Sequence, residues 1–156
     1  MSESVRNVEA LVQPATLALL GGARVVYAAD IDRVGDGRAS RARSFRLRYS
    51  AVENLGKFLG ESALRLMRVV ESNERTAQRR KEQGVLSAEE SDRIARIARV
   101  IQRAIEAFGD KSQAKEWIKR PSRALQGFAP LGLLGTDAGA ALVTDELGRI
   151  EHGDLY

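Results

Sequence analysis

The sequence contains no cysteine, a single histidine (His152), and aromatic residues amount to only 5% of its 156 positions. Without cysteine the chain cannot form disulfides or a thiolate zinc site, so a cytoplasmic location needs no special argument. Its longest apolar runs, such as residues 131–134, are far shorter than the roughly 20 residues that span a bilayer. The first residues include Glu3 and Glu9 and no basic, apolar leader, so we expect neither secretion nor membrane insertion. The scarcity of nucleophiles, bases and metal ligands argues against an enzyme, and we expect no cofactor.

The positive charge of the chain is concentrated in one block. The whole chain has a net charge of +4, whereas residues 33–81 hold thirteen Lys or Arg against five Asp or Glu, a local net charge of +8. Such a block raises the local electrostatic potential for a polyanion such as a nucleic acid. A solvated, arginine-rich surface explains the charge alone equally well.

The first third of the chain is weakly patterned. Pro14 and Gly21 bracket a short apolar segment, which predicts a helix between them, whereas residues 25–31 fit a helix or a strand. Residues 33–44 are rich in Gly, Ser and Arg, which is typical of a mobile basic linker. Residues 44–49 alternate as a strand does. No partner strand is evident nearby. Two further interpretations of residues 44–49 are therefore as good as a strand within the chain: an extended segment that leads into a helix, and a strand that pairs with a second copy of the chain.

From residue 50 onward the pattern is helical, and the fold class is mostly α. Serine, threonine and glycine residues mark the predicted helix ends. The expected helices and caps are 50–59 (Ser50, Gly60), 63–70 (Ser62), 74–83 (Gly84), 88–108 (Ser87, Gly109), a short helix after Ser112 that stops at Pro121, a turn over 130–134, and 137–150 (Thr136, Gly153).

The helix over 88–108 has the clearest signals. Ser87 and Glu90 form a capping box at its start. Apolar residues at i, i+3, i+4 spacing predict a stripe that faces the core: Ile94, Ile97, Ala98, Ile101, Ile105 and Phe108. Arginines occupy a different face: Arg93, Arg96, Arg99 and Arg103.

The helices over 63–70 and 74–83 have the lengths and the short break of a helix-turn-helix. The second helix carries side chains suited to nucleic acid: Arg75, Thr76, Gln78, Arg79, Arg80 and Lys81. Arg and Gln make bidentate contacts with guanine and adenine edges, and Thr76, Arg80 and Lys81 suit phosphates. Short basic helices are common on proteins that never bind DNA, so a solvated face is the competing interpretation.

Residues 111–156 carry little chemistry of their own. Trp117 fits an exposed anchor for a partner, although a tryptophan of a small core is the commoner case. His152 has no neighbours that would make it a ligand or a catalytic base, so we expect it to be solvated. No residue here or elsewhere suggests a catalytic or metal site.

A series of short motifs runs in order along the chain from residue 75. They are Arg75-Thr76, Arg79-Arg80-Lys81, Leu86-Ser87, Ser91-Asp92-Arg93, Phe108-Gly109-Asp110, Trp117, Pro121, Pro130-Leu131, Leu133-Leu134, Thr136, Gly139, Leu147-Gly148-Arg149-Ile150 and His152-Gly153. With these motifs, residues 50–156 resemble the antitoxins of RES–Xre type II toxin–antitoxin modules, the Xre/MbcA/ParS family. Residues 1–45 take no part in the resemblance.

The resemblance implies three segments: an arm and basic linker over 1–45, an Xre-like helix-turn-helix and dimerisation domain over 46–110, and a toxin-binding domain over 111–156. It implies an antitoxin that neutralises a RES-domain, NAD-degrading toxin by blocking its active site. It also implies a homodimer that binds operator DNA and represses its own operon.

The resemblance also implies which residues serve the toxin-binding domain. They are Trp117, Pro130, Leu131, Leu134, Arg149, His152, Gly153 and Tyr156. Pro130, Leu131 and Leu134, with Gly139, would shape the small domain, whereas Arg149, His152 and Gly153 would approach the toxin. The alternative function is a DNA-binding transcriptional repressor whose C-terminal domain serves only dimerisation.

Overall fold

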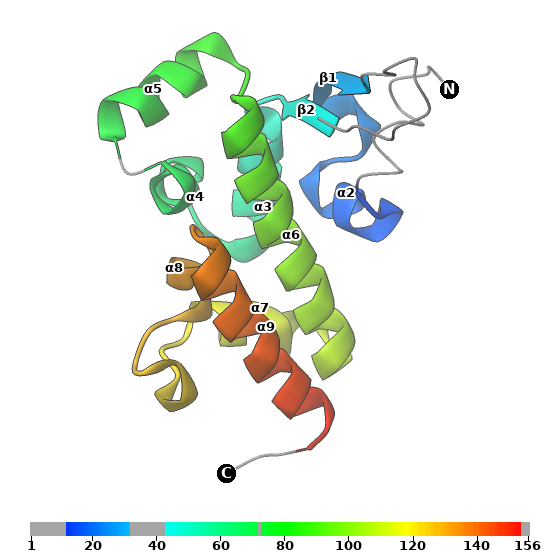
Figure 1. The fold of residues 1–156 in the computed structure, drawn as a ribbon, viewed down its shortest axis with the longest axis vertical. Coiled ribbons are helices and arrows are strands. Elements are labelled where there is room, and N and C mark those ends of the chain that lie inside the picture. The colour runs from blue at the N-terminus through cyan, green and yellow to red at the C-terminus, as the bar shows by residue number, and fades with distance from the viewer. Residues whose placement is uncertain (1–11, 32–42, 72, 154–156) are drawn as a thin grey trace, which may run out of the picture.

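The computed structural model describes residues 12–31, 43–71 and 73–153, and these are mostly helical (Figure 1), which confirms the predicted fold class. The elements are α2 (Pro14–Leu20), the 3-10 turn η1 (Ala23–Val25), β1 (Val26–Ile31), β2 (Arg43–Leu47), α3 (Ser50–Leu59), α4 (Ala63–Val70), α5 (Glu74–Gln83), α6 (Ala88–Phe108), α7 (Lys111–Lys119), the 3-10 turn η2 (Arg123–Leu125), α8 (Pro130–Leu133) and α9 (Asp137–Glu151). Nearly all of the predicted basic linker lies outside the described residues, as does Tyr156. Within the described ranges, no helix combines the length and the apolarity that a membrane span needs.

Helix α6 is the central helix of the fold, and elements from both parts of the chain pack against it. Its capping box is confirmed, because Ser87 Oγ accepts a hydrogen bond from the Glu90 N–H at 3.1 Å and the Glu90 carboxylate accepts one from the Ser87 N–H at 2.8 Å. The predicted apolar stripe is confirmed as core, with Phe108 and Ile105 partly buried and the other four positions buried. The helix packs against α2 and β2 from the early part of the chain and against α7 and α9 from the late part. In Figure 1 it runs through the middle of the structure, from beside α5 and the sheet down alongside α9.

The arginine face of α6 holds other elements in place. Arg93 Nη1 donates to the Val70 carbonyl oxygen at the end of α4, at 2.6 Å. Further along, Arg96 pairs with Asp137 at the start of α9. Arg103 Nη2 lies 3.2 Å from a carboxylate oxygen of Glu151, at the end of α9. Because α6 contacts both parts of the chain, the predicted division at residue 110 stays a prediction.

The predicted strand near residue 45 has its partner within the same chain. Strand β2 pairs with β1 in antiparallel register, with Val26 opposite Leu47 and Ala29 opposite Phe45. The pair is therefore neither an extended helix entry nor a contact between two copies. Its sequence signal is weak because β1 and β2 are separated by residues 32–42 and not by a two-residue hairpin turn.

The predicted cap of α3 is wrong. Tyr49 stands at its N-cap with φ −57° and ψ −27°, without a side-chain cap bond, and Ser50 is the first helical residue. The Tyr49 N–H donates to the carbonyl oxygen of Gly84 at 2.8 Å, so the chain enters α3 directly from the sheet. The backbone already has helical angles before Ser50, and the serine has no cap position to fill.

The predicted cap of α7 is also wrong. Asp110 takes this position, and its Oδ1 accepts a hydrogen bond from the Gln113 N–H at 2.8 Å. Gly109 ends α6 in the left-handed region, at φ 67°, and so frees the next residue to begin a helix. Ser112 lies inside α7 and is exposed.

Two glycines allow the C-terminal elements to pack closely. A Cβ atom on Gly139 would lie 1.9 Å from the carbonyl oxygen of Leu133, and one on Gly135 would lie 2.1 Å from that of Val69. The first approach joins α8 to α9, and the second joins their connection to α4. No residue with a side chain fits either position without a shift of the backbone.

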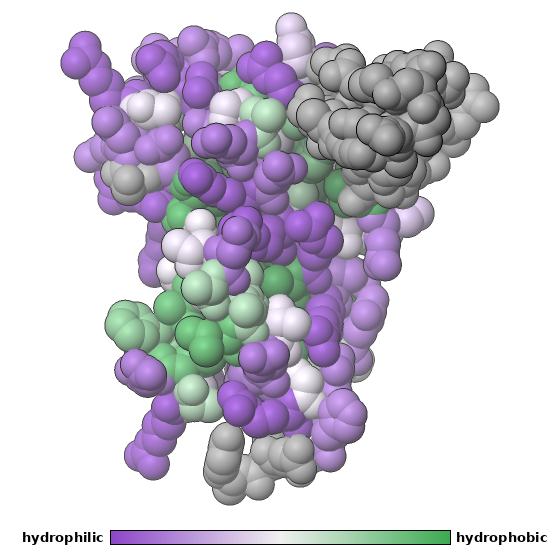
Figure 2. Space-filling view, in the orientation of Figure 1, coloured by the Kyte–Doolittle hydropathy of each residue, from purple (hydrophilic) through white to green (hydrophobic). Residues whose placement is uncertain are grey.

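The molecular surface differs between the end where α5 lies and the region around α8 (Figure 2). Hydrophilic residues cover the end where α5 lies, whereas hydrophobic residues gather over α8 and the start of α9. In the described C-terminal part of the chain, the large apolar residues that are exposed are Phe128, just before α8, and Leu142 on α9.

Candidate nucleic-acid and toxin interfaces

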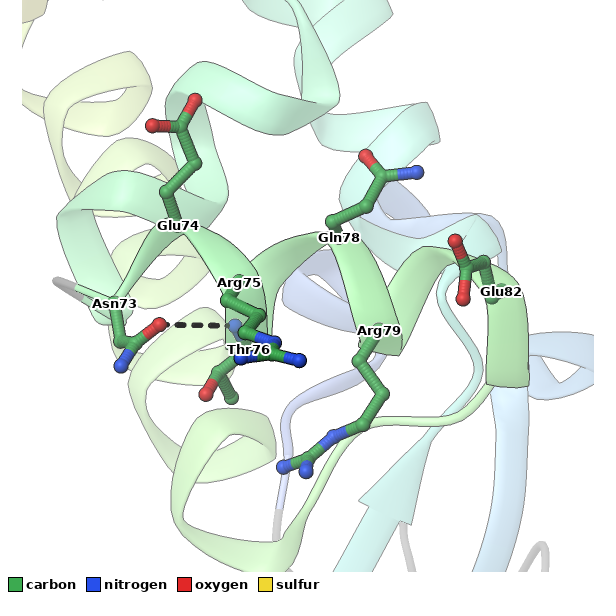
Figure 3. Close-up of a pocket in the computed structure, with 7 residues that line it drawn as sticks. All are labelled: Asn73, Glu74, Arg75, Thr76, Gln78, Arg79 and Glu82. Carbon is green, nitrogen blue, oxygen red and sulfur yellow. Dashed lines mark hydrogen bonds between the residues drawn. The ribbon is translucent and has the colours of Figure 1, made fainter.

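Helix α5 presents a polar face to solvent. The Asn73 Oδ1 caps it by accepting a hydrogen bond from the Thr76 N–H at 3.1 Å, and Ala77 is the residue through which the helix reaches the core. The predicted contacts Arg75, Gln78 and Arg79 are exposed. Together with Asn73, Glu74, Thr76 and Glu82 they line one hollow (Figure 3). Figure 3 shows Arg75 and Arg79 extending to the same side of the helix.

Arg80 does not belong to this exposed face. Its Nε donates to both carboxylate oxygens of Glu90, at 3.0 and 2.8 Å, and its Nη1 donates to Gln83 Oε1 at 2.9 Å. The Arg80 side chain is only 17% exposed and that of Glu90 only 3%. Where the sequence predicted a phosphate contact, the structure shows an ion pair that attaches α5 to the start of α6. The signal was present, because Glu90 belongs to the capping box, but only the fold brings Arg80 beside it.

The remaining predicted DNA contacts are placed differently. Lys81 is exposed, and Thr76 is half-buried. Acids accompany the cations: Glu74 pairs with Arg68 of α4, and Glu82 shares the hollow with Arg79. The exposed face of α5 therefore carries both signs of charge.

Three of the predicted toxin-binding residues are core residues. Leu134 is fully buried, and Pro130 and Leu131 are buried as well. Because they are buried, their side chains are not available to a partner; that they shape the small domain, as the resemblance implies, stays a prediction. The short helix α8 lies against α4, α7 and α9, which accounts for the burial of this segment.

Trp117 packs inside the C-terminal region. Its ring lies 5.7 Å from the Phe108 ring at an angle of 51°, and the side chain is partly buried against the core. This contact joins α7 to the end of α6. The interpretation of Trp117 as a tryptophan of a small core is the one that the packing supports.

The other predicted toxin contacts lie at the end of α9. Arg149, His152 and Gly153 are exposed. Arg149 donates from Nε to the buried Glu146 carboxylate at 2.9 Å, and His152 Nδ1 lies 2.6 Å from the Gly148 carbonyl oxygen. These local contacts hold both side chains along the last turn of the helix.

Two exposed apolar residues were not predicted. Phe128 precedes α8 and is 59% exposed, and Leu142 on α9 is 55% exposed. On α9 the core positions include Gly139, Val143 and Leu147, which recur at a spacing of four residues. Leu142 and Ile150 both fall outside this spacing, so the sequence pattern alone does not single out Leu142, and the fold decides that it is exposed.

Two titratable groups have altered acidity. Asp92 on α6 is exposed as a whole residue, but partial loss of hydration raises the pKa of its carboxyl, against the opposing effect of Arg99 and Arg96. Burial also raises the pKa of the Tyr49 hydroxyl, and Glu53 adds to this effect. The described residues contain no group of His, Cys, Asp and Glu side chains that could hold a metal ion.

These features define a class of protein, namely a helix-turn-helix protein with an additional C-terminal interaction domain. Residues 39–99 match the model of the antitoxin Xre-like helix-turn-helix domain, and residues 103–153 match that of the antitoxin Xre/MbcA/ParS C-terminal toxin-binding domain. The chain belongs to this family of antitoxins.

Similar proteins named Antitoxin Xre occur in several bacteria. The protein of Photorhabdus laumondii is 48% identical over 71 residues, which are 45% of this chain and 48% of the relative. That of Yersinia enterocolitica is 45% identical over 48% of this chain and 51% of the relative. That of Pseudomonas putida is 34% identical over 44% and 43%, respectively. The matched part thus spans about half the length of each relative.

Proposed function

We propose that this chain neutralises a RES-domain, NAD-degrading toxin by covering the toxin's active site, and that it represses its own operon by binding operator DNA as a homodimer. Both activities would take place in the cytoplasm, where NAD and the operon are found. The observation that carries the proposal is the exposed apolar surface of the toxin-binding domain, which includes Phe128 and Leu142.

The apolar surface is suited to a protein partner. Phe128 and Leu142 are more than half exposed, and a contiguous exposed apolar surface marks a protein–protein contact more often than other functions. Aromatic and aliphatic anchors at the centre of an interface supply most of its binding free energy. Polar groups near the end of α9, including Arg149 and His152, would form the rim of this contact.

The toxin part is tested by co-expression with the RES-domain protein encoded beside this chain. Leu142→Asp should abolish growth rescue and allow NAD loss, because a carboxylate in an apolar contact loses its hydration without gaining a partner. Arg120→Asp is the matched control, since this side chain is 73% exposed at the end of α7, and it should rescue growth. Full rescue by Leu142→Asp and by Phe128→Asp would contradict the proposed docking surface.

Removal of residues 145–156 is a less specific test of the same idea. The deletion should abolish rescue, but Leu147 and Glu146 are buried, so it also removes part of the core. Point variants on the exposed surface leave these residues in place and separate binding from folding.

The DNA part is tested with the promoter region of the chain's own operon. Arg75→Gln and Arg79→Gln should each weaken binding and reduce the salt dependence by about one unit of slope for each phosphate that is no longer neutralised. Lys111→Gln, at the exposed start of α7, should bind as the wild type does. A homodimer predicts a palindromic operator with half-sites one helical turn, or a multiple of it, apart. Absence of salt-sensitive promoter binding by the wild type would contradict this part.

The alternative is a repressor whose C-terminal domain serves only dimerisation, and the same apolar surface would then bind a second copy. The two functions differ in the oligomeric state of Leu142→Asp. An antitoxin keeps its dimer and loses the toxin, whereas a plain repressor becomes monomeric. Light scattering on the purified variant distinguishes them.

A further inference from the structure

A tyrosine and two arginines form a compact group on the outer face of the β1–β2 sheet. Tyr27 is 51% exposed. The Cζ atoms of Arg46 and Arg48 lie 5.5 and 5.4 Å from the centroid of its ring. Both distances fall within the range of a cation–π interaction.

The strand pattern explains why this group faces solvent. Along β2 and the residues after it, Phe45, Leu47 and Tyr49 are buried, and the alternating residues Arg46 and Arg48 are exposed. Two like charges beside one ring repel each other, and neither is paired with a carboxylate among the residues that the structure describes. An anion that bridges them would relieve this repulsion.

The group is held firmly and is connected to α5. Arg46 Nε donates to the Leu86 carbonyl oxygen at 2.9 Å, and Arg48 forms a β-bridge with Val85. Gly84 and Val85 directly follow α5, so the sheet and the end of this helix share backbone hydrogen bonds. Figure 1 shows α5 and the sheet at the same end of the molecule.

We propose that this outer sheet face is a second nucleic-acid contact, in which Arg46 and Arg48 bind phosphates of the duplex backbone beside the segment that α5 contacts. Tyr27 positions the two guanidinium groups. The inference rests on the proposed DNA binding and adds to it a site outside the helix-turn-helix. Charge complementarity identifies the ligand, because duplex DNA presents closely spaced phosphates to both arginines at once.

The experiment measures binding of labelled promoter DNA to the full chain over a range of salt concentrations. Arg48→Gln should weaken binding roughly tenfold near 0.1 M salt and lower the salt slope by about one unit. Tyr27→Leu should have a smaller effect of the same sign, whereas Tyr27→Phe retains the ring and should bind as the wild type does. Arg120→Gln, on the exposed end of α7, is the matched control. Circular dichroism verifies that each variant is folded.

Three results overturn the inference, and they are distinct from one another. If Arg79→Gln weakens binding but Arg48→Gln leaves affinity and slope unchanged, the sheet face makes no DNA contact and the proposed function stands. If the wild type itself shows no salt-dependent binding, the proposed DNA function and this inference both fail. If Arg48→Gln changes the oligomeric state or toxin binding instead of the salt slope, the face serves a protein partner.

Discussion

Helix α5 carries the predicted DNA contacts and helix α9 leads to the exposed predicted toxin contacts, and the two helices are attached to the molecule in different ways. Helix α5 reaches the core through Ala77 and is joined to α6 by the Arg80–Glu90 ion pair. Helix α9 buries Val143 and Leu147 against the core. One helix is therefore held mainly by a polar contact, and the other mainly by apolar packing.

The exposed faces of the two helices differ as their attachments do, because the face of α5 is polar and that of α9 includes a large apolar side chain. The hollow along α5 is lined by charged and polar side chains, whereas α9 exposes the large apolar side chain of Leu142. Electrostatic contacts weaken as salt is added, but apolar contacts do not. If both proposals hold, DNA binding should depend strongly on salt and toxin binding only weakly.

The largest effect is expected where α5 is attached to α6. Glu90→Ala leaves the Arg80 guanidinium and the Ser87 N–H without their acceptor, which should lower the free energy of unfolding by about 3 kcal/mol. DNA affinity should fall further than toxin affinity. Urea titration provides the measurement, with Glu74→Ala as the control, because its exposed ion pair contributes at most about 1 kcal/mol. Equal reductions in stability in the two variants would contradict the role assigned to the ion pair.

A smaller reduction is expected where α8 meets α9. Gly139→Ala places a methyl group against the Leu133 carbonyl oxygen, which should cost about 2 kcal/mol and displace α9. Gly132→Ala is the matched control, because a Cβ there meets no atom within 4 Å. Thermal unfolding and toxin rescue should both separate the two variants. If they unfold alike, the close approach of α8 to α9 does not limit the fold.

A modest gain in DNA binding is expected from α5 itself. Glu82→Gln removes an acid from the hollow that contains Arg79, and it should tighten promoter binding about twofold to threefold at low salt. Glu106→Gln replaces an exposed acid of α6 and should leave the affinity unchanged. The same affinity for Glu82→Gln and the wild type would place the DNA away from this end of α5.

The smallest effect concerns the pH dependence of stability. Because partial loss of hydration raises the folded-state pKa of Asp92, protonation favours the folded state. The stabilisation by the protonated form is complete below the unfolded pKa near 3.8 and is lost as pH rises through the raised folded value. Asp92→Asn should remove this dependence and raise stability at neutral pH by less than about 0.5 kcal/mol, because the residue is exposed. Stability curves of the two proteins that stay parallel from pH 3 to 7 would contradict it.

Most helix ends were predictable because their hydrogen bonds join residues only a few positions apart. The Ser62 cap, the Ser87–Glu90 capping box and the Thr136 cap are confirmed, as are the left-handed glycines Gly60 and Gly84. The two predicted caps that are wrong, Ser50 and Ser112, lie where the preceding element determines the backbone path. The sheet before Tyr49 and the end of α6 before Asp110 impose backbone angles that a local serine does not override.

The candidate contacts divide in the same way. The sequence by itself determined the class of the protein, its helices and the polar face of α5, because these depend on residue spacing along single helices. Only the tertiary structure decided which side chains are free to bind. It paired Arg80 with Glu90, buried Leu134 and left Leu142 exposed, because these outcomes depend on contacts between elements that the chain brings together only on folding.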